Sequence, residues 1–196
     1  EVADEGLPET VGVAAVNGPH SVVVSGVAAD VDTIAEHWRA EGRKATRLKV
    51  SHAFHSPLMD PMLDDFRTVL DSVSYETPAI PIVSTLTGKP VSGAELGSAD
   101  YWVRHVRESV RFADAVVDMG ADVLVEIGPG GVLSALGQES LPDAAFVPVL
   151  RGDRPEDNAV MTALAELDVR GVRVDWDAYY AGSGYTVDLP TYAFQY

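Results

Sequence analysis

The sequence predicts an α+β protein that starts with a small ferredoxin-like subdomain. In residues 1–98 the apolar residues switch several times between a period of two, typical of strands, and a period of 3.6, typical of helices. The resulting order is strand, strand, helix, strand, helix, strand, which fits an α+β layer of the ferredoxin-like type. The chain has 196 residues, of which 46% are apolar, enough for one substantial core.

A β-hairpin and a helix are predicted first. Residues 13–16 and 21–25 contain short valine-rich runs, and the Asn-Gly-Pro sequence at 17–19 between them favours a turn. An amphipathic helix is predicted from Asp30, because an isoleucine and a tryptophan lie four residues apart and Gly42 provides a stop.

A third strand and a second helix follow. Residues 44–54 alternate in a β-like way, and Ser56 precedes a proline, which disfavours the helical region there. After Pro57 the apolar residues have helical spacing. These residues are Met59, Met62, Leu63, Phe66, Val69 and Leu70. Residues 80–91 then predict a strand and a turn.

Residues 99–150 add an α/β piece. Two helical segments are predicted within 99–119, and the apolar run at 121–128 is typical of a buried strand. A Gly-Pro-Gly-Gly turn follows at 128–131 and opens a helix that could offer backbone N–H groups to an anion. Residues 144–150 predict one more strand.

Residues 151–196 differ in character and are predicted to form a linker. Asp153 is expected to cap a helix, Glu156 to complete a capping box, and Gly171 to end the helix. The segment after it is rich in tyrosine and interrupted by Gly and Pro. Such a segment is expected to lie extended across a neighbouring surface, with its aromatic rings as anchors.

The composition excludes several classes of protein. The net charge of −16 argues against a nucleic-acid partner, whose phosphates would be repelled. The sequence has no long apolar run and no signal-peptide pattern, so we expect a cytoplasmic protein without a membrane span. Cys is absent, which excludes disulfides and zinc–thiolate sites. The chain begins with Glu rather than Met, so we expect a fragment, a processed product or an artificial start.

The sequence "HAFH" at residues 52–55 is the main candidate for chemistry. Two histidines three apart share a face only on a helix, and this stretch is predicted to be extended, so we expect no metal site. One histidine could act as a general base near neutral pH. Alternatively, both are partly exposed polar residues that close a strand. No G-x-S-x-G serine motif occurs in the chain, so a nucleophile for such a base is missing.

Several motifs together carry a family resemblance. They are "VAAVNGPHSVVVSG", "VSHAFHSPLMDPML", "YWVRHVRESVRF", "VLVEIGPGGVL" and "VDLPTYAFQY". In this order they resemble the C-terminal half of the acyltransferase domain of modular type I polyketide synthases, followed by its linker. "HAFH" is similar to the signature of members that select malonyl-CoA.

The resemblance implies a role for four residues. His55 matches the catalytic histidine, which is the base for a serine nucleophile. Phe54 matches the specificity position, His52 would support the signature, and Asn17 would contact substrate or carrier. The implied reaction moves a malonyl group from malonyl-CoA to the phosphopantetheine thiol of an acyl carrier protein, with no cofactor bound by this chain.

The resemblance also divides the chain. Residues 1–98 would be the ferredoxin-like small subdomain, 99–150 the C-terminal part of an α/β-hydrolase-like large subdomain, and 151–196 the post-acyltransferase linker. The serine elbow, the oxyanion-hole glutamine and the arginine for the malonyl carboxylate are not in the sequence, so the chain alone is expected to be inactive. The alternative is a non-catalytic module that positions neighbouring synthase domains, including the ketosynthase.

Overall fold

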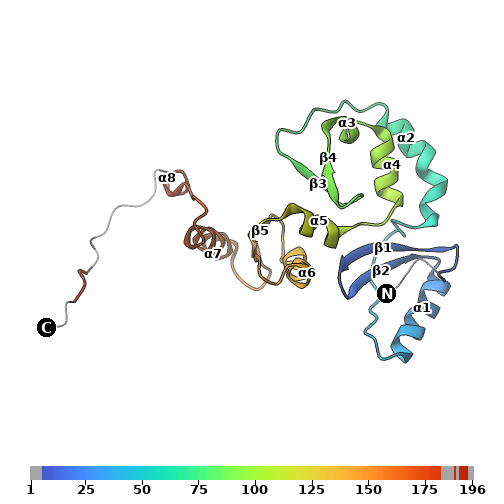
Figure 1. Ribbon diagram of the computed structural model, residues 1–196, viewed down its shortest axis with the longest axis horizontal. Helices are drawn as coiled ribbons and strands as arrows, with labels where there is room; N and C mark the ends of the chain where they lie inside the picture. Colours follow the sequence, from blue (N-terminus) through green and yellow to red (C-terminus); the bar gives the residue numbers. More distant parts are fainter. Residues whose placement is uncertain (1–5, 182–187, 189, 194–196) are drawn as a thin grey trace.

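The computed structural model describes residues 6–181, 188 and 190–193 (Figure 1). Within these residues the strands pair in three two-stranded sheets, β1–β2, β3–β4 and β5–β6. The first two pairs are antiparallel and the third is parallel, so the α+β class is confirmed at the level of a mixed fold. No helix in the described part of the chain is long and apolar enough to span a membrane.

The predicted hairpin and first helix are confirmed. Strands β1 (Val11–Gly18) and β2 (Ser21–Gly26) form the hairpin, and α1 (Ala28–Ala40) follows it directly. The N-cap of the helix is Val27, three residues before Asp30, so the helix begins earlier than expected. Asp30 lies in the first turn instead, where its carboxylate accepts a hydrogen bond from the Thr10 hydroxyl.

The predicted strand over residues 44–54 is wrong. No strand forms there, and Leu48 and Val50 are 56% and 70% exposed. Alternation indicates which side chains share a face, but a strand also needs a neighbour for its backbone groups, and this segment has none in the described residues. In the described residues β1–β2 and β3–β4 lie in separate sheets. The ferredoxin-like subdomain over residues 1–98 stays a prediction.

The helix predicted after Pro57 is confirmed and has two parts. A 3₁₀ helix, η1 (Pro57–Met62), leads into α2 (Leu63–Leu70). Ser56 caps η1, because its hydroxyl oxygen accepts a hydrogen bond from the backbone N–H of Leu58 at 3.3 Å. The HAFH stretch therefore ends directly before a capped helix, with Ser56 as the cap.

A small core lies between the β3–β4 hairpin and the helix after it. It joins strands β3 (Ile82–Ser84) and β4 (Lys89–Val91) to helices α3 (Gly93–Leu96) and α4 (Ala99–Arg107). Its buried members are Leu86, Leu96 and Tyr101, with Val91 and Trp102 packed against them. Because this cluster crosses residue 98, α4 packs with the elements that precede it in the chain.

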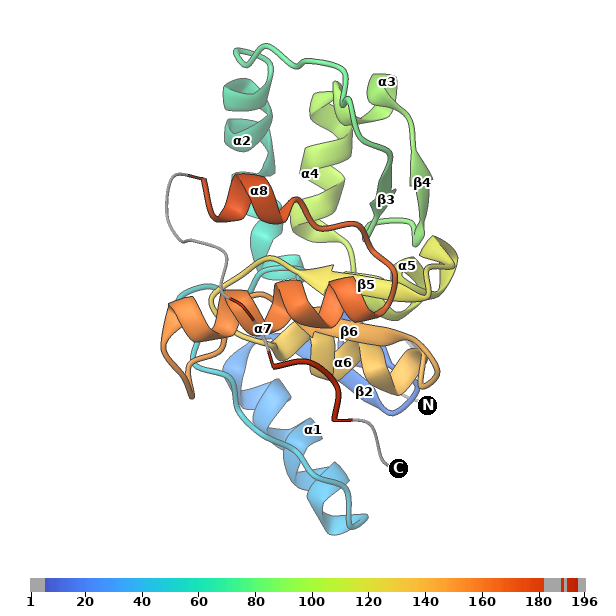
Figure 2. The ribbon, with the colours of Figure 1, turned by 90° about the vertical axis from the view of Figure 1, so that its left-hand side faces the viewer.

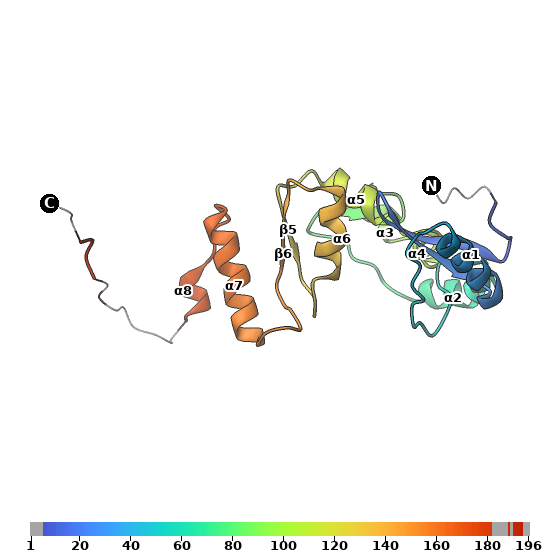
Figure 3. The same ribbon diagram turned by 90° about the horizontal axis from the view of Figure 1, so that it is seen from below.

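The α/β piece at 99–150 has the predicted order of elements. Helix α5 (Phe112–Met119) is followed by strand β5 (Val123–Glu126), helix α6 (Val132–Ser140) and strand β6 (Ala145–Pro148). Strand β6 contributes the fully buried Val147. Figure 3 shows the β5–β6 pair between α6 on one side and the next helix on the other.

The last helices differ from the prediction at their start. Helix α7 (Glu156–Val169) has Pro155 as its N-cap, and Asp153 instead pairs with the guanidinium groups of Arg151 and Arg154. Gly171 ends the helix as expected, with a φ of +83°. A single turn, α8 (Trp176–Tyr179), follows where an extended segment was predicted. The expectation for the closing aromatic residues falls mostly outside the described residues.

Candidate active site

His55 lies in a strained turn directly before η1. Its φ is +57°, and within the described residues no other non-glycine residue has a positive φ. Backbone strain of this kind is held in place by surrounding contacts. Here the His55 N–H donates to the Val106 carbonyl at 3.1 Å, and a Cβ on Gly12 would lie only 3.3 Å from the His55 carbonyl oxygen. Gly12 thus permits the close approach of β1 to this turn.

The His55 ring is oriented by a backbone carbonyl. Its Nδ1 lies 2.8 Å from the Glu108 carbonyl oxygen. A carbonyl can only accept a hydrogen bond, so Nδ1 must carry the hydrogen and Nε2 is left with a free lone pair. This tautomer is the one that can accept a proton at Nε2, as a general base must. The ring is half-buried.

The Glu108 carbonyl is itself held from two sides. The Glu108 N–H donates to the Arg104 carbonyl at 2.7 Å, and their side chains form an ion pair with contacts of 2.7 and 3.1 Å. On the other side, the Ser109 hydroxyl donates to the Val13 carbonyl, and Val110 pairs with β1 through two hydrogen bonds of 2.8 Å. The acceptor for His55 is therefore built into the end of α4 and the edge of β1.

His105 is a second imidazole beside the first. The centroids of the His55 and His105 rings are 6.4 Å apart, and the Nε2 atom of His105 lies 3.1 Å from the Thr85 hydroxyl. Burial lowers the pKa of His105, and the nearby charge of His55 lowers that pKa further. The lowered pKa favours the neutral form of His105.

Ser56, next to His55, does not serve as its nucleophile. Ser56 is fully buried, and its hydroxyl donates to the Ala53 carbonyl at 2.6 Å. The hydroxyl also caps η1, so both of its roles are structural. Beyond it, the carboxylate of Asp60 pairs with Arg107 and ties η1 to α4. These contacts fix the backbone that carries His55.

Phe54 and His52 lie together on the exposed side of the turn. Phe54 is 47% exposed, and its ring meets that of His52 edge to face at 6.1 Å. His52 is exposed, with its Nδ1 atom 3.1 Å from the Ser51 hydroxyl. In the described residues no three His, Cys, Asp or Glu side chains are grouped to hold a metal ion.

Asn17 is half-buried in β1, five residues beyond Gly12, which corresponds to roughly 16 Å along a strand. The hydrogen bonds and ring contacts of His55 in the described residues do not include Asn17. Its neighbours Val16 and Gly18 line a separate hollow of about 790 Å³, together with Lys89 and Arg111. A substrate or carrier contact for Asn17 stays a prediction.

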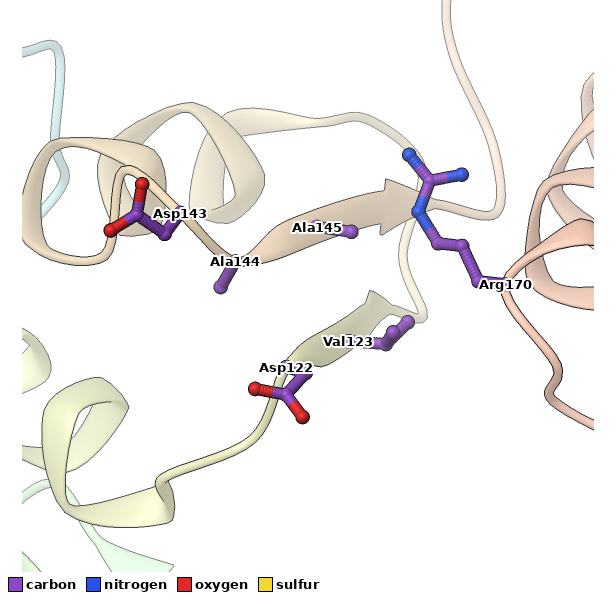
Figure 4. Close-up of a pocket in the computed structure, with 6 residues that line it drawn as sticks. All are labelled: Asp122, Val123, Asp143, Ala144, Ala145 and Arg170. Carbon is purple, nitrogen blue, oxygen red and sulfur yellow. The ribbon is translucent and has the colours of Figure 1, made fainter.

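Two other places with polar groups differ from the His55 site. Asp122 and Asp143, which precede β5 and β6, and Arg170 line a hollow of about 420 Å³. Figure 4 shows these side chains around the two strands. At the N-terminus of α6, both oxygens of Glu126 accept backbone hydrogen bonds, from Leu133 at 3.1 Å and from Ser134 at 2.7 Å. The chain's own carboxylate thus occupies the place where the sequence suggested an external anion.

Sequence reasoning missed the residues that orient His55. Glu108 contributes a backbone carbonyl, which any residue could supply, so its identity gives no signal. Arg104 and Glu108 have the i, i+4 spacing that favours an ion pair on a helix. This spacing is the signal in the sequence that could have indicated an ordered end of α4.

The family profile described as "Acyl transferase domain" matches residues 2–174. The chain belongs to this acyl transferase family. Polyketide synthase GfsA of Streptomyces halstedii is 55% identical over 192 residues, which cover 94% of this chain and 3% of that protein. Mycoketide-CoA synthase of Mycobacterium tuberculosis is 46% identical over 194 residues, which are 96% of this chain and 5% of that protein.

Solved acyltransferase structures share the fold. The acyltransferase domain from the second module of the salinomycin polyketide synthase matches with a TM-score of 0.83 and 52% identity, over 95% of this chain and 45% of that one. The acyl-carrier-protein-S-malonyltransferase from Bartonella henselae matches with a TM-score of 0.68 and 28% identity, over 83% of this chain and 50% of that one. The chain thus spans about half of the solved acyltransferases and a small part of the synthases it resembles.

Proposed function

We propose that this chain is part of a polyketide synthase acyltransferase that loads malonyl units from malonyl-CoA onto an acyl carrier protein. The observation that carries the proposal is the hydrogen bond between Nδ1 of His55 and the Glu108 carbonyl, which leaves Nε2 free to accept a proton. The membership of the acyl transferase family and the likeness to an acyl-carrier-protein-S-malonyltransferase support it.

In the proposed reaction His55 moves the protons of two acyl transfers. A serine hydroxyl from a part of the domain outside these 196 residues gives its proton to Nε2 of His55 as its oxygen attacks the malonyl thioester carbon. The carbon–sulfur bond breaks, and the CoA sulfur leaves with the proton from His55. The carrier thiol then gives its proton to His55 and attacks the serine ester, and the serine oxygen recovers the proton.

The Glu108 carbonyl contributes at the moment when the ring is charged. The imidazolium form donates from both nitrogens, and the hydrogen bond from Nδ1 to Glu108 becomes charge-assisted and stronger. The hydrogen bond to Glu108 would therefore assist each transfer at the stage when the ring carries the proton.

Phe54 is proposed to set the preference for malonyl over methylmalonyl groups. Its exposed ring precedes His55 directly and would narrow the space beside the α-carbon of the acyl group. Excluding one methyl group is worth about 1–3 kcal/mol, so the residue would set a preference and would not be an absolute gate.

The test uses the complete acyltransferase domain with labelled malonyl-CoA. The wild-type domain should acquire label on serine, and His55→Ala should lose at least about a hundredfold in the rate of labelling. His20→Ala, an exposed histidine in the β1–β2 turn, is the matched control and should label normally. Labelling that is unchanged in His55→Ala would remove the proposed base. A wild-type domain that never labels would favour the structural module instead.

A further inference from the structure

The carbonyl that orients His55 lies at the point where α4 ends. Glu108 is the C-cap of this helix, and its backbone is extended, with a φ of −84° and a ψ of 163°. The chain leaves the helix there, so helical hydrogen bonds do not fix the residues that follow. The Glu108 carbonyl and the Ser109 nitrogen belong to one planar peptide unit. A contact that fixes Ser109 therefore also fixes the direction of the Glu108 carbonyl.

The Ser109 side chain anchors the segment after the helix. Its hydroxyl donates to the Val13 carbonyl of β1, a residue 96 positions away along the chain. Val110 adds two backbone hydrogen bonds to β1, one from its N–H to the Ala14 carbonyl and one from the Val16 N–H to its own carbonyl, both at 2.8 Å. Ser109 is half-buried, which limits the access of water to this contact.

A bulge in β1 provides the acceptors for this anchor. The register with β2 shifts between Val13 and Ala15, and Ala14 has no Cα partner in β2. A bulge interrupts the ladder of hydrogen bonds, so backbone groups beside it can bind another segment. Val13 and Ala14 are 8% and 5% exposed. The anchor for the end of α4 is therefore part of the packed core.

The same stretch of β1 contacts the turn that carries His55. Gly12 directly precedes Val13, and a Cβ on Gly12 would lie 3.3 Å from the His55 carbonyl oxygen. Successive strand residues are about 3.3 Å apart. Within one such step, β1 meets both the His55 turn and the Ser109 hydroxyl. The strand is thus a common support for the base and for its acceptor.

We propose that Ser109 is a positioning residue for His55, because its hydroxyl bond to β1 holds the Glu108–Ser109 peptide with the carbonyl facing Nδ1. The inference rests on the proposed function, since it takes His55 as the base. Groups that take part in catalysis need hydrogen bonds behind them that hold them within about 0.5 Å of the working geometry. Without the hydroxyl, the peptide loses one of these bonds and the carbonyl tilts away from the ring.

The test removes the hydroxyl in the complete acyltransferase domain and follows the labelling of serine by labelled malonyl-CoA. Ser109→Ala should lower the maximal rate roughly tenfold, because a small misplacement at the site is costly. The KM for malonyl-CoA should stay within about twofold, since Ser109 acts through the base. Ser109→Thr keeps a hydroxyl and should label within about twofold of the wild-type rate. Ser109→Cys, a weaker donor of similar size, should lie between the two and replaces Ser109→Ala if that variant does not fold.

Ser72→Ala is the matched control. Ser72 follows the end of α2, and its hydroxyl also donates to a backbone carbonyl, that of Val69, at 2.6 Å. Figure 2 shows α2 running away from α1 and the β1–β2 hairpin, so this hydrogen bond is remote from His55. The control variant loses the same kind of bond and should keep the wild-type rate of labelling, whatever stability it loses in urea.

Nitrogen-15 NMR of labelled histidine separates positioning from a loss of stability. In the wild-type and Ser72→Ala domains, neutral His55 should carry its hydrogen on Nδ1, and in Ser109→Ala a measurable share should move to Nε2. A slower Ser109→Ala domain with an unchanged tautomer would overturn the positioning role. A wild-type rate in Ser109→Ala or Ser109→Cys would do the same, as would a Ser109→Thr domain as slow as Ser109→Ala. A wild-type domain that never labels would contradict the proposed function instead.

Discussion

Glu126 provides a stringent test of the structure, because its carboxylate alone accepts two of the backbone hydrogen bonds at the N-terminus of α6. Its two oxygens accept the backbone N–H groups of Leu133 and Ser134. Glu126→Gln keeps the shape but replaces one acceptor oxygen by an NH₂ group that faces another donor. A hydrogen bond to a charged group is worth about 1.5–3 kcal/mol when buried, and solvent screening reduces this at a partly exposed carboxylate. We expect the variant to lose about 1–2 kcal/mol in its free energy of unfolding.

The stability difference between wild type and Glu126→Gln should depend on pH, which provides a control for this prediction. Burial raises the pKa of Glu126, but the hydrogen bonds from Ser134 and Leu133 outweigh it, so the net shift is downward. A carboxyl group with a depressed folded pKa stabilises the protein above its unfolded pKa of about 4.3, and this contribution is lost as pH falls through the folded pKa. The difference between wild type and Glu126→Gln should therefore shrink below about pH 4.

The assay is urea unfolding of the complete domain, with tryptophan fluorescence as the signal for the folded fraction. Glu36→Gln, which changes an exposed carboxyl group on α1, should change stability by less than about 0.5 kcal/mol. Equal stability of wild type and Glu126→Gln at neutral pH would refute the reasoning.

Three further predictions concern the site and its support. Phe54→Ser should shift the ratio of kcat/KM toward methylmalonyl-CoA by about tenfold or more in competition assays, and an unmoved ratio would place specificity elsewhere. Tyr101→Phe removes the buried 2.7 Å hydrogen bond to Ser84 and should cost about 1 kcal/mol in urea unfolding, whereas a neutral result would mean that Ser84 finds another partner. The lowered pKa of His105 should make the domain lose stability as pH falls below about 6.5, and His105→Phe should flatten that slope; an identical slope would contradict the buried, neutral ring.

The elements that were predicted correctly are those for which several short-range signals agree, such as apolar runs, turn-forming residues and helical spacing. The hairpin has valine-rich runs on both sides of a turn-forming sequence, and β5 is followed at once by glycines and a helical period. The strand predicted at 44–54 had only its alternation, which contains no information about a partner strand. Asp153 had the right residue type for a cap, but two neighbouring arginines bind its carboxylate.

The site was predictable only in part. The resemblance drew attention to His55, and the family membership is confirmed. Its orienting group is a carbonyl 53 residues away along the chain, and no pattern in the side chains announces a backbone contact of that kind. Selectivity for malonyl groups and the roles of Phe54, His52 and Asn17 stay predictions.

The most direct measurement of the central claim is the tautomer of His55 in the complete domain, from nitrogen-15 NMR of labelled histidine. We expect the neutral form of His55 to carry hydrogen on Nδ1 and a lone pair on Nε2, because Nδ1 donates to the Glu108 carbonyl. A neutral His55 with hydrogen on Nε2 would contradict it, since that ring could not accept a proton from a serine at Nε2.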